Sequence, residues 1–224
     1  MRAMILAAGR GERLKPLTDA TPKPLIIAGG KPLIVHVIER LVLAGFAQVV
    51  INLGYLGDQI EAVLGDGSAL GAKIAYSREP KEALETGGGI FQALPLLSDP
   101  FLVVNADVAT DFPFTELPRQ IPGLAHLVLV PNPVHHPRGD FAFTEGWVKD
   151  QGAPRYTFSG IGVYRHALFA GCRPGRFPLA PILRRAIAQG QVSGQLYLGF
   201  WSDIGTLDRL EALERYLQRR GGEL

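Results

Sequence analysis

The stretch Leu6–Thr18 constrains the fold of this chain more than any other, because it joins a short apolar run to a loop that contains glycines. The run before the loop, Ala3–Leu6, is typical of a buried strand in a parallel sheet. Small residues after a strand allow backbone N–H groups to face a bound anion without side chains in the way. The sequence therefore predicts a phosphate-binding loop directly after the first strand.

The spacing within this loop differs from that of the two commonest phosphate-binding loops. The chain contains no Gly-x-x-x-x-Gly-Lys-Ser/Thr run, and Gly9-x-Gly11 is not completed by the third small residue of a dinucleotide-binding loop. Lys23 lies farther along, between two prolines that we expect to hold it in an extended segment outside any helix. Together with Arg13, it places two positive charges near the loop, which suits a polyphosphate undergoing attack.

Strand and helix patterns alternate from residue 1 to residue 107. Apolar or β-branched runs predict strands over 3–6, 48–52, 73–77 and 101–104, and apolar residues at helical spacing predict helices over 32–44, 58–64 and 88–96. Such alternation is the pattern of a doubly wound, Rossmann-like parallel sheet.

Beyond Asp107 the pattern changes to strand-like runs joined by short proline and glycine turns. It predicts strands over 126–130, 139–144, 146–149, 155–165 and 196–200, and helices over 178–189 and 207–219. We expect a mixed or antiparallel extension that covers the open side of the site. The predicted fold class is therefore α/β, with a Rossmann-like doubly wound mixed sheet, and 224 residues fit one large domain.

The composition excludes several classes of protein. Hydrophobic residues make up 47% of the chain and charged residues 20%, so a sizeable core is expected and global disorder is not. A net charge of +2 is too small to indicate nucleic-acid binding. The single cysteine, Cys172, fits a reducing compartment, and no apolar run suits a signal peptide or a membrane helix. We expect a cytoplasmic protein that binds neither nucleic acid nor membranes.

Three segments that follow predicted strands are candidates for the functional site, since open α/β sheets bind ligands beyond the carboxyl ends of their strands. They are Gly9–Lys23, Asn105–Asp107 and Trp201–Thr206. The acids Asp107 and Asp203 are candidate ligands of Mg²⁺, because this ion takes one or two carboxylates and is completed by water and substrate phosphates. The alternative for each acid is a capping role, in a turn or before the helix at 207.

The N-terminal motifs resemble those of the sugar nucleotidyltransferases, also called nucleotide-diphospho-sugar pyrophosphorylases. The family signature is similar to Leu6-Ala7-Ala8-Gly9-x-Gly11-x-Arg13-Leu14, followed by Pro16-Leu17-Thr18 and Pro22-Lys23-Pro24-Leu25. The resemblance covers nearly the whole chain and implies the nucleotide-diphospho-sugar transferase fold, with a nucleotide-binding part over 1–110 and a sugar-binding part over 111–224. The sequence departs from the family at Ala106, where glycine is usual before the acid.

The resemblance implies a reaction between two phosphate compounds. A phosphate oxygen of a sugar 1-phosphate would attack the α-phosphorus of a nucleoside triphosphate, and pyrophosphate would leave. Catalysis then depends on positioning and on neutralisation of charge. Arg13 would hold the departing phosphates, Lys23 would lie between the α-phosphate and the sugar phosphate, and Mg²⁺ on Asp107 and Asp203 would bridge the substrates.

The same resemblance implies contacts with each substrate. The nucleotide would contact Ala8, Gly9, Gly11, Glu12, Arg13, Lys23, Gly87 and Gly88, and the sugar would contact Asn105, Gly139, Asp140, Phe158, Ser159 and Asp203. The run Glu79–Gly89 is similar to the family's base-recognition loop, and a helix start capped by Thr86 is the alternative. The pair His135-His136 lacks a partner acid at ligand spacing, so we expect it in a solvated loop.

The choice of substrates stays open within the family. The run Leu84–Gly89, the short chain and Asn105-Ala106-Asp107 most resemble bacterial members that join UTP to N-acetylmuramic acid 1-phosphate in peptidoglycan recycling. Alternatives are transfer from GTP to mannose 1-phosphate, from dTTP or UTP to glucose 1-phosphate, or from CTP to phosphocholine, and a non-catalytic nucleotide-sugar sensor. An NAD-dependent dehydrogenase is disfavoured by the missing third glycine. We expect a monomer or a small homo-oligomer.

Overall fold

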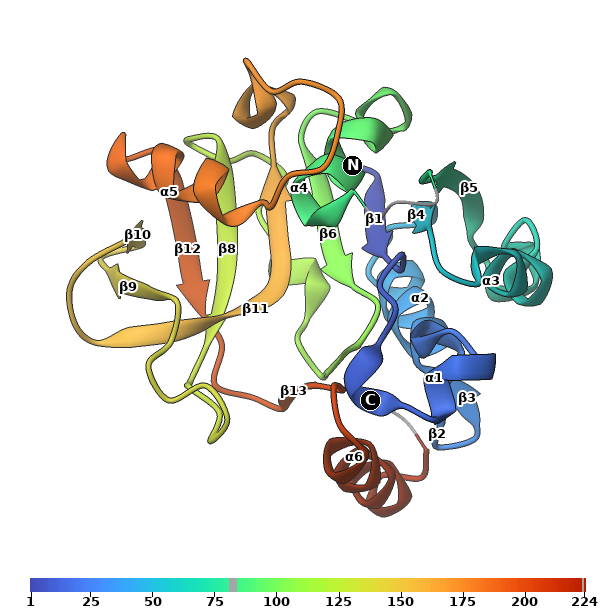
Figure 1. Ribbon diagram of the computed structural model, residues 1–224. Coiled ribbons are helices and arrows are strands. Elements are labelled where there is room, and N and C mark those ends of the chain that lie inside the picture. The colour runs from blue at the N-terminus through green and yellow to red at the C-terminus, as the bar shows by residue number, and fades with distance from the viewer. Residues whose placement is uncertain (81–83, 223) are drawn as a thin grey trace.

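The computed structural model describes residues 1–80, 84–222 and 224. Within these residues, nine strands form a mixed sheet in the order β5-β4-β1-β6-β11-β8-β12-β10-β9 (Figure 1). The strands of this sheet are β1 (Ala3–Leu6), β4 (Gln48–Leu53), β5 (Lys73–Arg78), β6 (Phe101–Asn105), β8 (Ala125–Val130), β9 (Phe141–Thr144), β10 (Trp147–Lys149), β11 (Arg155–Tyr164) and β12 (Val192–Leu196). One continuous sheet thus runs through both halves of the chain.

Helices cover both faces of this sheet, and two short strand pairs lie outside it. The helices are α1 (Leu17–Ala20), α2 (Leu33–Leu43), α3 (Gly57–Leu64), α4 (Glu85–Ala93), α5 (Ala180–Ala188) and α6 (Leu207–Arg219). The pairs are β2 (Ile27–Ala28) with β3 (Lys31–Pro32), and β7 (Val108–Thr110) with β13 (Trp201–Asp203). No helix in the described part of the chain is long and apolar enough to span a membrane.

The parallel half of the sheet brings three strand ends together. β1 pairs in parallel with β4 on one side and with β6 on the other. Leu6 is opposite Asn52 in the first pair and opposite Asn105 in the second. The segments that follow these strands therefore leave the sheet at the same edge, as the alternation of strands and helices predicts.

The apolar core has two main layers, one on each face of the sheet. Successive residues of a strand point to opposite faces. Ile5 of β1 accordingly packs in one cluster with Ile34 of α2, whereas Met4 packs in another with Ile90 of α4. A third, smaller cluster joins Leu217 of α6 to the apolar residues around the N-terminal loop.

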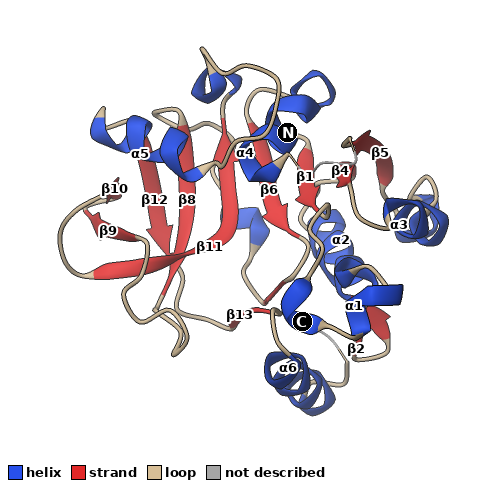
Figure 2. Cartoon of the chain, viewed as in Figure 1, coloured by secondary structure: helices blue, strands red, loops and turns tan. Residues whose placement is uncertain are grey.

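The antiparallel half depends on the long strand β11. This strand pairs with β6, β8 and β9, and it crosses the sheet obliquely between them (Figure 2). Its register against β8 shifts between Phe158 and Gly162. Gly160 lies within this bulge at φ 79°, where a Cβ would come within 2.6 Å of Asn105 Nδ2. The bulge thus allows β11 to approach the end of β6.

Most predicted elements are confirmed, but the strand predicted over 196–200 is wrong. β12 lies earlier, at Val192–Leu196, and the residues after it connect to β13. Two of these residues bind one carboxylate, because Tyr197 Oη and the Phe200 N–H both donate to Asp111 Oδ1. The helix predicted over 88–96 begins earlier, at Glu85.

The carboxylate of Asp111 anchors α6 as well, and it gives the first testable prediction. Burial works to raise the pKa of Asp111, but hydrogen bonds from Tyr197, Arg220 and the Phe200 N–H lower it overall. A folded-state pKa below the unfolded value stabilises the fold at neutral pH, and this contribution is lost as the pH falls below about 4. We expect Asp111→Asn to lower Tm at about pH 7 by about 3 °C or more, and to reduce the fall in Tm between about pH 5 and about pH 3. Thermal unfolding followed by circular dichroism measures both effects, and identical pH profiles would contradict them.

Candidate active site

A cavity of about 410 Å³ opens at the carboxyl ends of β1, β4 and β6. It contains most of the residues that the N-terminal motifs single out, together with others that they do not. The lining residues are Leu6, Ala7, Ala8, Gly9, Gly11, Glu12, Arg13, Leu14, Lys23, Pro24, Asn52, Glu79, Glu85, Thr86, Asn105, Ala106, Asp107 and Gly205. The cavity therefore lies where an open parallel sheet binds its ligands.

Gly11 shapes the loop that leads into the cavity. Its φ of +66° lies in the left-handed region, and it precedes the short helix η1 (Glu12–Leu14). A Cβ at this position would come within 2.9 Å of Lys23 Cβ and 3.0 Å of Thr18 Cγ2. Thr18 Oγ1 donates to the Gly11 carbonyl at 3.0 Å, which fixes the turn. Glycine here therefore permits both the backbone conformation and the approach of Lys23.

We expect Gly11→Ala to weaken nucleotide binding at least about tenfold, because left-handed strain of about 1–2 kcal/mol adds to the clash with Lys23. The nucleotide KM in a pyrophosphate-release assay measures the effect. Gly30→Ala is a matched control, since Gly30 also has a positive φ of 80°, but a Cβ there would meet no atom within 4 Å. An equal rise in KM in both variants would mean that general strain, rather than the position of Lys23, is responsible.

Lys23 contacts the first of the two predicted acids. Its ammonium group forms an ion pair with Asp107 Oδ2, and only 13% of the Lys23 side chain and 25% of the Asp107 side chain are exposed. The expectation that Lys23 lies outside any helix is wrong, because Lys23 begins the short 3-10 helix η2 (Lys23–Leu25). Pro24 occupies the first turn, where its missing N–H is not needed.

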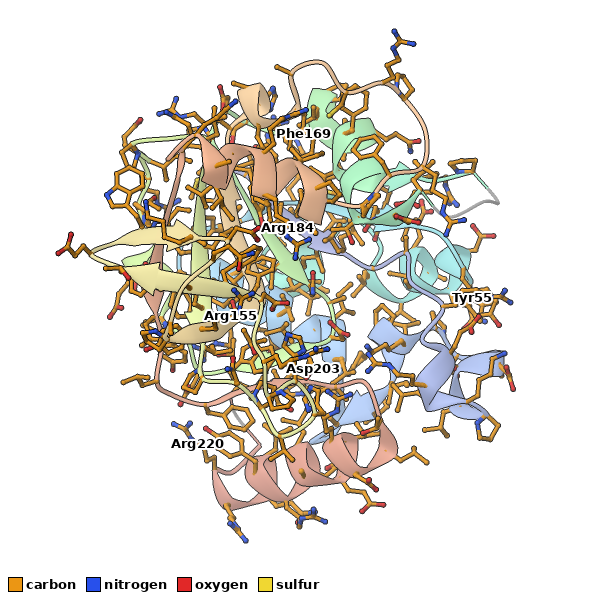
Figure 3. The ribbon with its side chains drawn as sticks, turned by 60° about the vertical axis from the view of Figure 1, so that its left-hand side comes forward. Tyr55, Arg155, Phe169, Arg184, Asp203 and Arg220 are labelled. Carbon is orange, nitrogen blue, oxygen red and sulfur yellow. The ribbon has the colours of Figure 1, made fainter. Side chains whose placement is uncertain are left out.

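The strand pair β7–β13 brings the two acids together although they are 96 residues apart in sequence (203 − 107). In this pair Asp203 is opposite Val108, the residue after Asp107. The Ile204 N–H donates to the Asp107 carbonyl at 2.8 Å. Asp203 lies between the sheet and α6 (Figure 3). The main-chain ladder therefore holds the backbones of Asp107 and Asp203 close together.

One carboxylate oxygen of Asp203 has no hydrogen-bond partner among the described residues. Arg209 Nη1 lies 2.5 Å from Asp203 Oδ2 and 2.8 Å from His135 Nε2. Since arginine can only donate, His135 Nε2 is the acceptor in this contact, although it also lies 3.0 Å from Asp203 Oδ1. Asp203 Oδ1 is buried and has no hydrogen-bond donor among the described residues. A buried carboxylate oxygen without a donor is unfavourable, and a cation would satisfy it.

Arg13 lies beside the segment that follows Asp203. A Cβ at Gly205 would come within 2.8 Å of Arg13 Nη2 and 2.6 Å of Arg209 Nη2, so only glycine leaves room for both guanidinium groups. Arg13 is exposed and lines the cavity from η1. The cavity thus has an accessible cation at its rim and the Lys23–Asp107 pair in its wall.

Gly87 and Gly88 lie in the buried part of α4 and not along the cavity. A Cβ at Gly87 would come within 2.6 Å of Phe177 Cδ2, and one at Gly88 would meet the Gly175 carbonyl. The Gly88 N–H donates to the Phe177 carbonyl at 3.0 Å. These glycines make room for protein atoms, and the preceding residues Glu85 and Thr86 line the cavity instead. Residues 81–83 of the predicted base-recognition loop lie outside the described residues.

The predicted sugar-binding residues divide into two groups. Asn105 lines the cavity, whereas Gly139, Asp140, Phe158 and Ser159 do not. Asp140 Oδ2 accepts the Phe158 N–H at 2.8 Å. Ser159 Oγ donates to the Val128 carbonyl at 2.7 Å and is buried. Their observed bonds therefore hold the antiparallel half together, and a sugar-binding role for them stays a prediction.

Sequence reasoning missed three residues at this site: Asn52, His135 and Arg209. His135 lies exposed in a loop, as expected, but it also contacts Arg209 and lies beside Asp203. Arg209 lies six residues after Asp203, in the first turns of the predicted helix, and this spacing could have suggested a contact. An asparagine near the end of a β-branched strand is a comparable signal for Asn52.

An exposed arginine and a lysine–aspartate pair thus line a cavity at the carboxyl ends of parallel strands, where open α/β sheets bind their ligands. Residues 2–139 match the family model described as Nucleotidyl transferase. The chain therefore belongs to the nucleotidyl transferase family.

Several known proteins are similar to this chain over nearly its whole length. An N-acetylmuramate alpha-1-phosphate uridylyltransferase from Neisseria meningitidis serogroup B is 54% identical, over 94% of this chain and 96% of its own. A protein of the same name from Caulobacter vibrioides is 36% identical, over 91% of each chain. The structure of an inositol-1-phosphate CTP transferase from T. maritima superposes with a TM-score of 0.80, over 97% of this chain and 96% of that one, at 19% identity. This last likeness concerns the fold alone.

Proposed function

We propose that this protein transfers a uridylyl group from UTP to N-acetylmuramic acid 1-phosphate, giving the UDP-sugar and pyrophosphate, in peptidoglycan recycling. The name of the relative that is 54% identical over nearly the full chain supports this choice of substrates. The observation that carries the reaction type is the Lys23–Asp107 ion pair in the wall of the cavity, next to which the β7–β13 pair holds the backbone of Asp203. The proposal includes a cytoplasmic location, in which the single cysteine stays reduced.

In the proposed reaction a phosphate oxygen of the sugar 1-phosphate forms a bond to the α-phosphorus of UTP. The bond from that phosphorus to the bridging oxygen breaks, and pyrophosphate leaves in line. Lys23, in the cavity wall, would neutralise charge between the α-phosphate and the incoming phosphate. Arg13, at the rim, would hold the departing β- and γ-phosphates. No covalent intermediate with the protein is needed.

The residues present fit a divalent cation, and we propose Mg²⁺. No cluster of three or more His, Cys, Asp or Glu side chains suits a metal in the described part of the chain. Mg²⁺ does not need one, because substrate phosphates and water complete its ligands. Asp107 and Asp203 would hold the ion, and the unbonded Asp203 Oδ1 supports this role. When bound, the ion would neutralise phosphate charge and orient the two substrates.

We further propose that the loop after β1 and the segment before α4 bind the nucleotide. Ala8, Gly9, Gly11 and Glu12 line the cavity and can present main-chain groups to the phosphates. Gly87 and Gly88 would not contact the nucleotide. They would act indirectly, because they allow the start of α4 to pack against Phe177 and Gly175. For the sugar, Asn105 is the predicted residue that already lines the cavity.

The test is pyrophosphate release by the purified protein with Mg²⁺. UTP with N-acetylmuramic acid 1-phosphate is compared with GTP, CTP and dTTP against mannose, glucose and choline phosphates, and a chelator control removes the metal. A clear preference for the first pair supports the proposal. Turnover with another pair alone would keep the chemistry and reject these substrates. Nucleotide binding without any turnover would favour the nucleotide-sugar sensor.

A further inference from the structure

Asn52 joins three parts of the cavity wall through its side-chain amide. Its Oδ1 accepts the N–H of Ala7, at the start of the loop after β1, at 2.7 Å. Its Nδ2 donates to Glu79 Oε1 at 2.6 Å. Glu79 Oε2 in turn accepts the N–H of Leu84, directly before α4, at 2.9 Å. A continuous path of hydrogen bonds thus links the β1 loop to the start of α4.

The surrounding glycines leave room for this path. A Cβ at Gly89 of α4 would come within 2.5 Å of Glu79 Oε1 and 3.0 Å of Asn52 Nδ2. A Cβ at Gly54 would come within 2.7 Å of the carbonyl oxygen of Ala8. The third glycine of the Gly87–Gly89 run therefore accommodates a buried polar pair, not a ligand. Asn52 is only 3% exposed, so the loss of either partner would leave a buried polar group unsatisfied.

We propose that Asn52 is a positioning residue that couples the phosphate-binding loop to the base side of the nucleotide site. This inference rests on the proposed binding of UTP in the cavity. Ala7, Asn52 and Glu79 all line that cavity, so a shift of the amide moves its wall at two ends. The donor and acceptor roles in this path are fixed. The Ala7 and Leu84 N–H groups can only donate, so the Asn52 amide must turn its oxygen toward Ala7 and its nitrogen toward Glu79.

These fixed roles can be tested by exchanging the amide and the carboxylate between positions 52 and 79. Asn52→Asp places two carboxylates against each other. In Glu79→Gln, the new NH2 group must face another donor, either the Asn52 amide nitrogen or the Leu84 N–H. In the double variant, the carboxylate at position 52 accepts from Ala7 and from the new amide at position 79, whose oxygen accepts from Leu84. All hydrogen bonds are then restored with an unchanged total charge.

Binding of UTP with Mg²⁺ is measured by titration calorimetry for the wild type, the two single variants and the double variant. We expect each single variant to weaken UTP binding about tenfold or more, and the double variant to return to within about threefold of the wild type. In turnover assays the KM for UTP should rise while the KM for the sugar 1-phosphate stays unchanged. Ser193→Ala, which removes a buried hydroxyl bonded to His126 in the antiparallel half, is the control for general loss of stability.

Unchanged UTP binding in Asn52→Asp, or a double variant that binds no better than the weaker single variant, would overturn the inference. If Asn52→Asp does not fold, the comparison of Glu79→Gln with the double variant decides in the same way. Arg13→Ala separates this inference from the proposed function. Should Arg13→Ala leave UTP binding unchanged, the proposed phosphate site fails; if it weakens binding while Asn52→Asp does not, only the coupling role fails.

Discussion

Replacement of Lys23 by methionine is expected to lower kcat by about 10²–10³, with a smaller effect on the sugar phosphate KM. The apolar stem of Lys23 is kept, and the ammonium group that faces Asp107 is lost. Its charge is proposed to act on the α-phosphate as negative charge builds up there, so the loss should affect the chemical step more than binding. Pyrophosphate release at saturating substrates measures this directly.

Lys31→Met is the matched control for Lys23→Met. Lys31 also forms an ion pair, with Glu39, but about 38% of its side chain is exposed and it lies outside the cavity. An exposed pair of this kind contributes about 0–1 kcal/mol, so Lys31→Met should keep wild-type turnover. Wild-type turnover in Lys23→Met itself, in a protein that folds normally, would rule out the assigned role of Lys23.

Asp203→Asn is expected to lower kcat/KM by about 10³ and to raise the Mg²⁺ concentration needed for half-maximal rate. The substitution keeps the shape of the side chain but removes the charge that, with Asp107, is proposed to hold the ion. Its amide would also face Arg209, which now pairs with Asp203 Oδ2. The rate is measured over a range of Mg²⁺ concentrations at fixed substrate.

The control for Asp203→Asn is Asp208→Asn, which removes an exposed acid from the first turn of α6. That variant should follow the wild-type Mg²⁺ dependence. If Asp203→Asn keeps the wild-type Mg²⁺ dependence, even at a reduced rate, Asp203 does not hold the ion. Its role would then be to position Arg209 and His135.

Local signals explain why much of the fold could be predicted from the sequence. The apolar run 3–6, the helix over 207–219 and the β-branched run 48–52 have clear periodicity and clear ends, so their positions are confirmed within a residue. The candidate site was inferred by placing three segments after strand ends. Two of these placements are confirmed, after β1 and at the end of β6, whereas the third was wrong because residues 201–203 form strand β13 themselves. The structure places Lys23 and Asp107 in the wall of one cavity and pairs Asp203 with Val108, the residue after Asp107. A catalytic role for these residues stays a prediction.

The failures concern contacts between distant residues. The apolar run 196–200 has the composition of a strand, but Asp111 binds Tyr197 and Phe200 and directs them away from the sheet. Similarly, nothing near Gly87 in the sequence indicates that Phe177 packs against it, so the sequence analysis assigned Gly87 to nucleotide binding. Such tertiary partners override local preference, and a single sequence carries no trace of them.

The pairing of β7 with β13 has a consequence for the order in which the protein becomes active during synthesis. Residues 1–107 contain the loop after β1, Lys23 and the first acid, whereas the second acid leaves the ribosome 96 residues later. Contacts across such a long separation form late, because the intervening chain must first be ordered. We therefore expect a growing chain to become active only after residue 203 has been made and β7 has paired with β13.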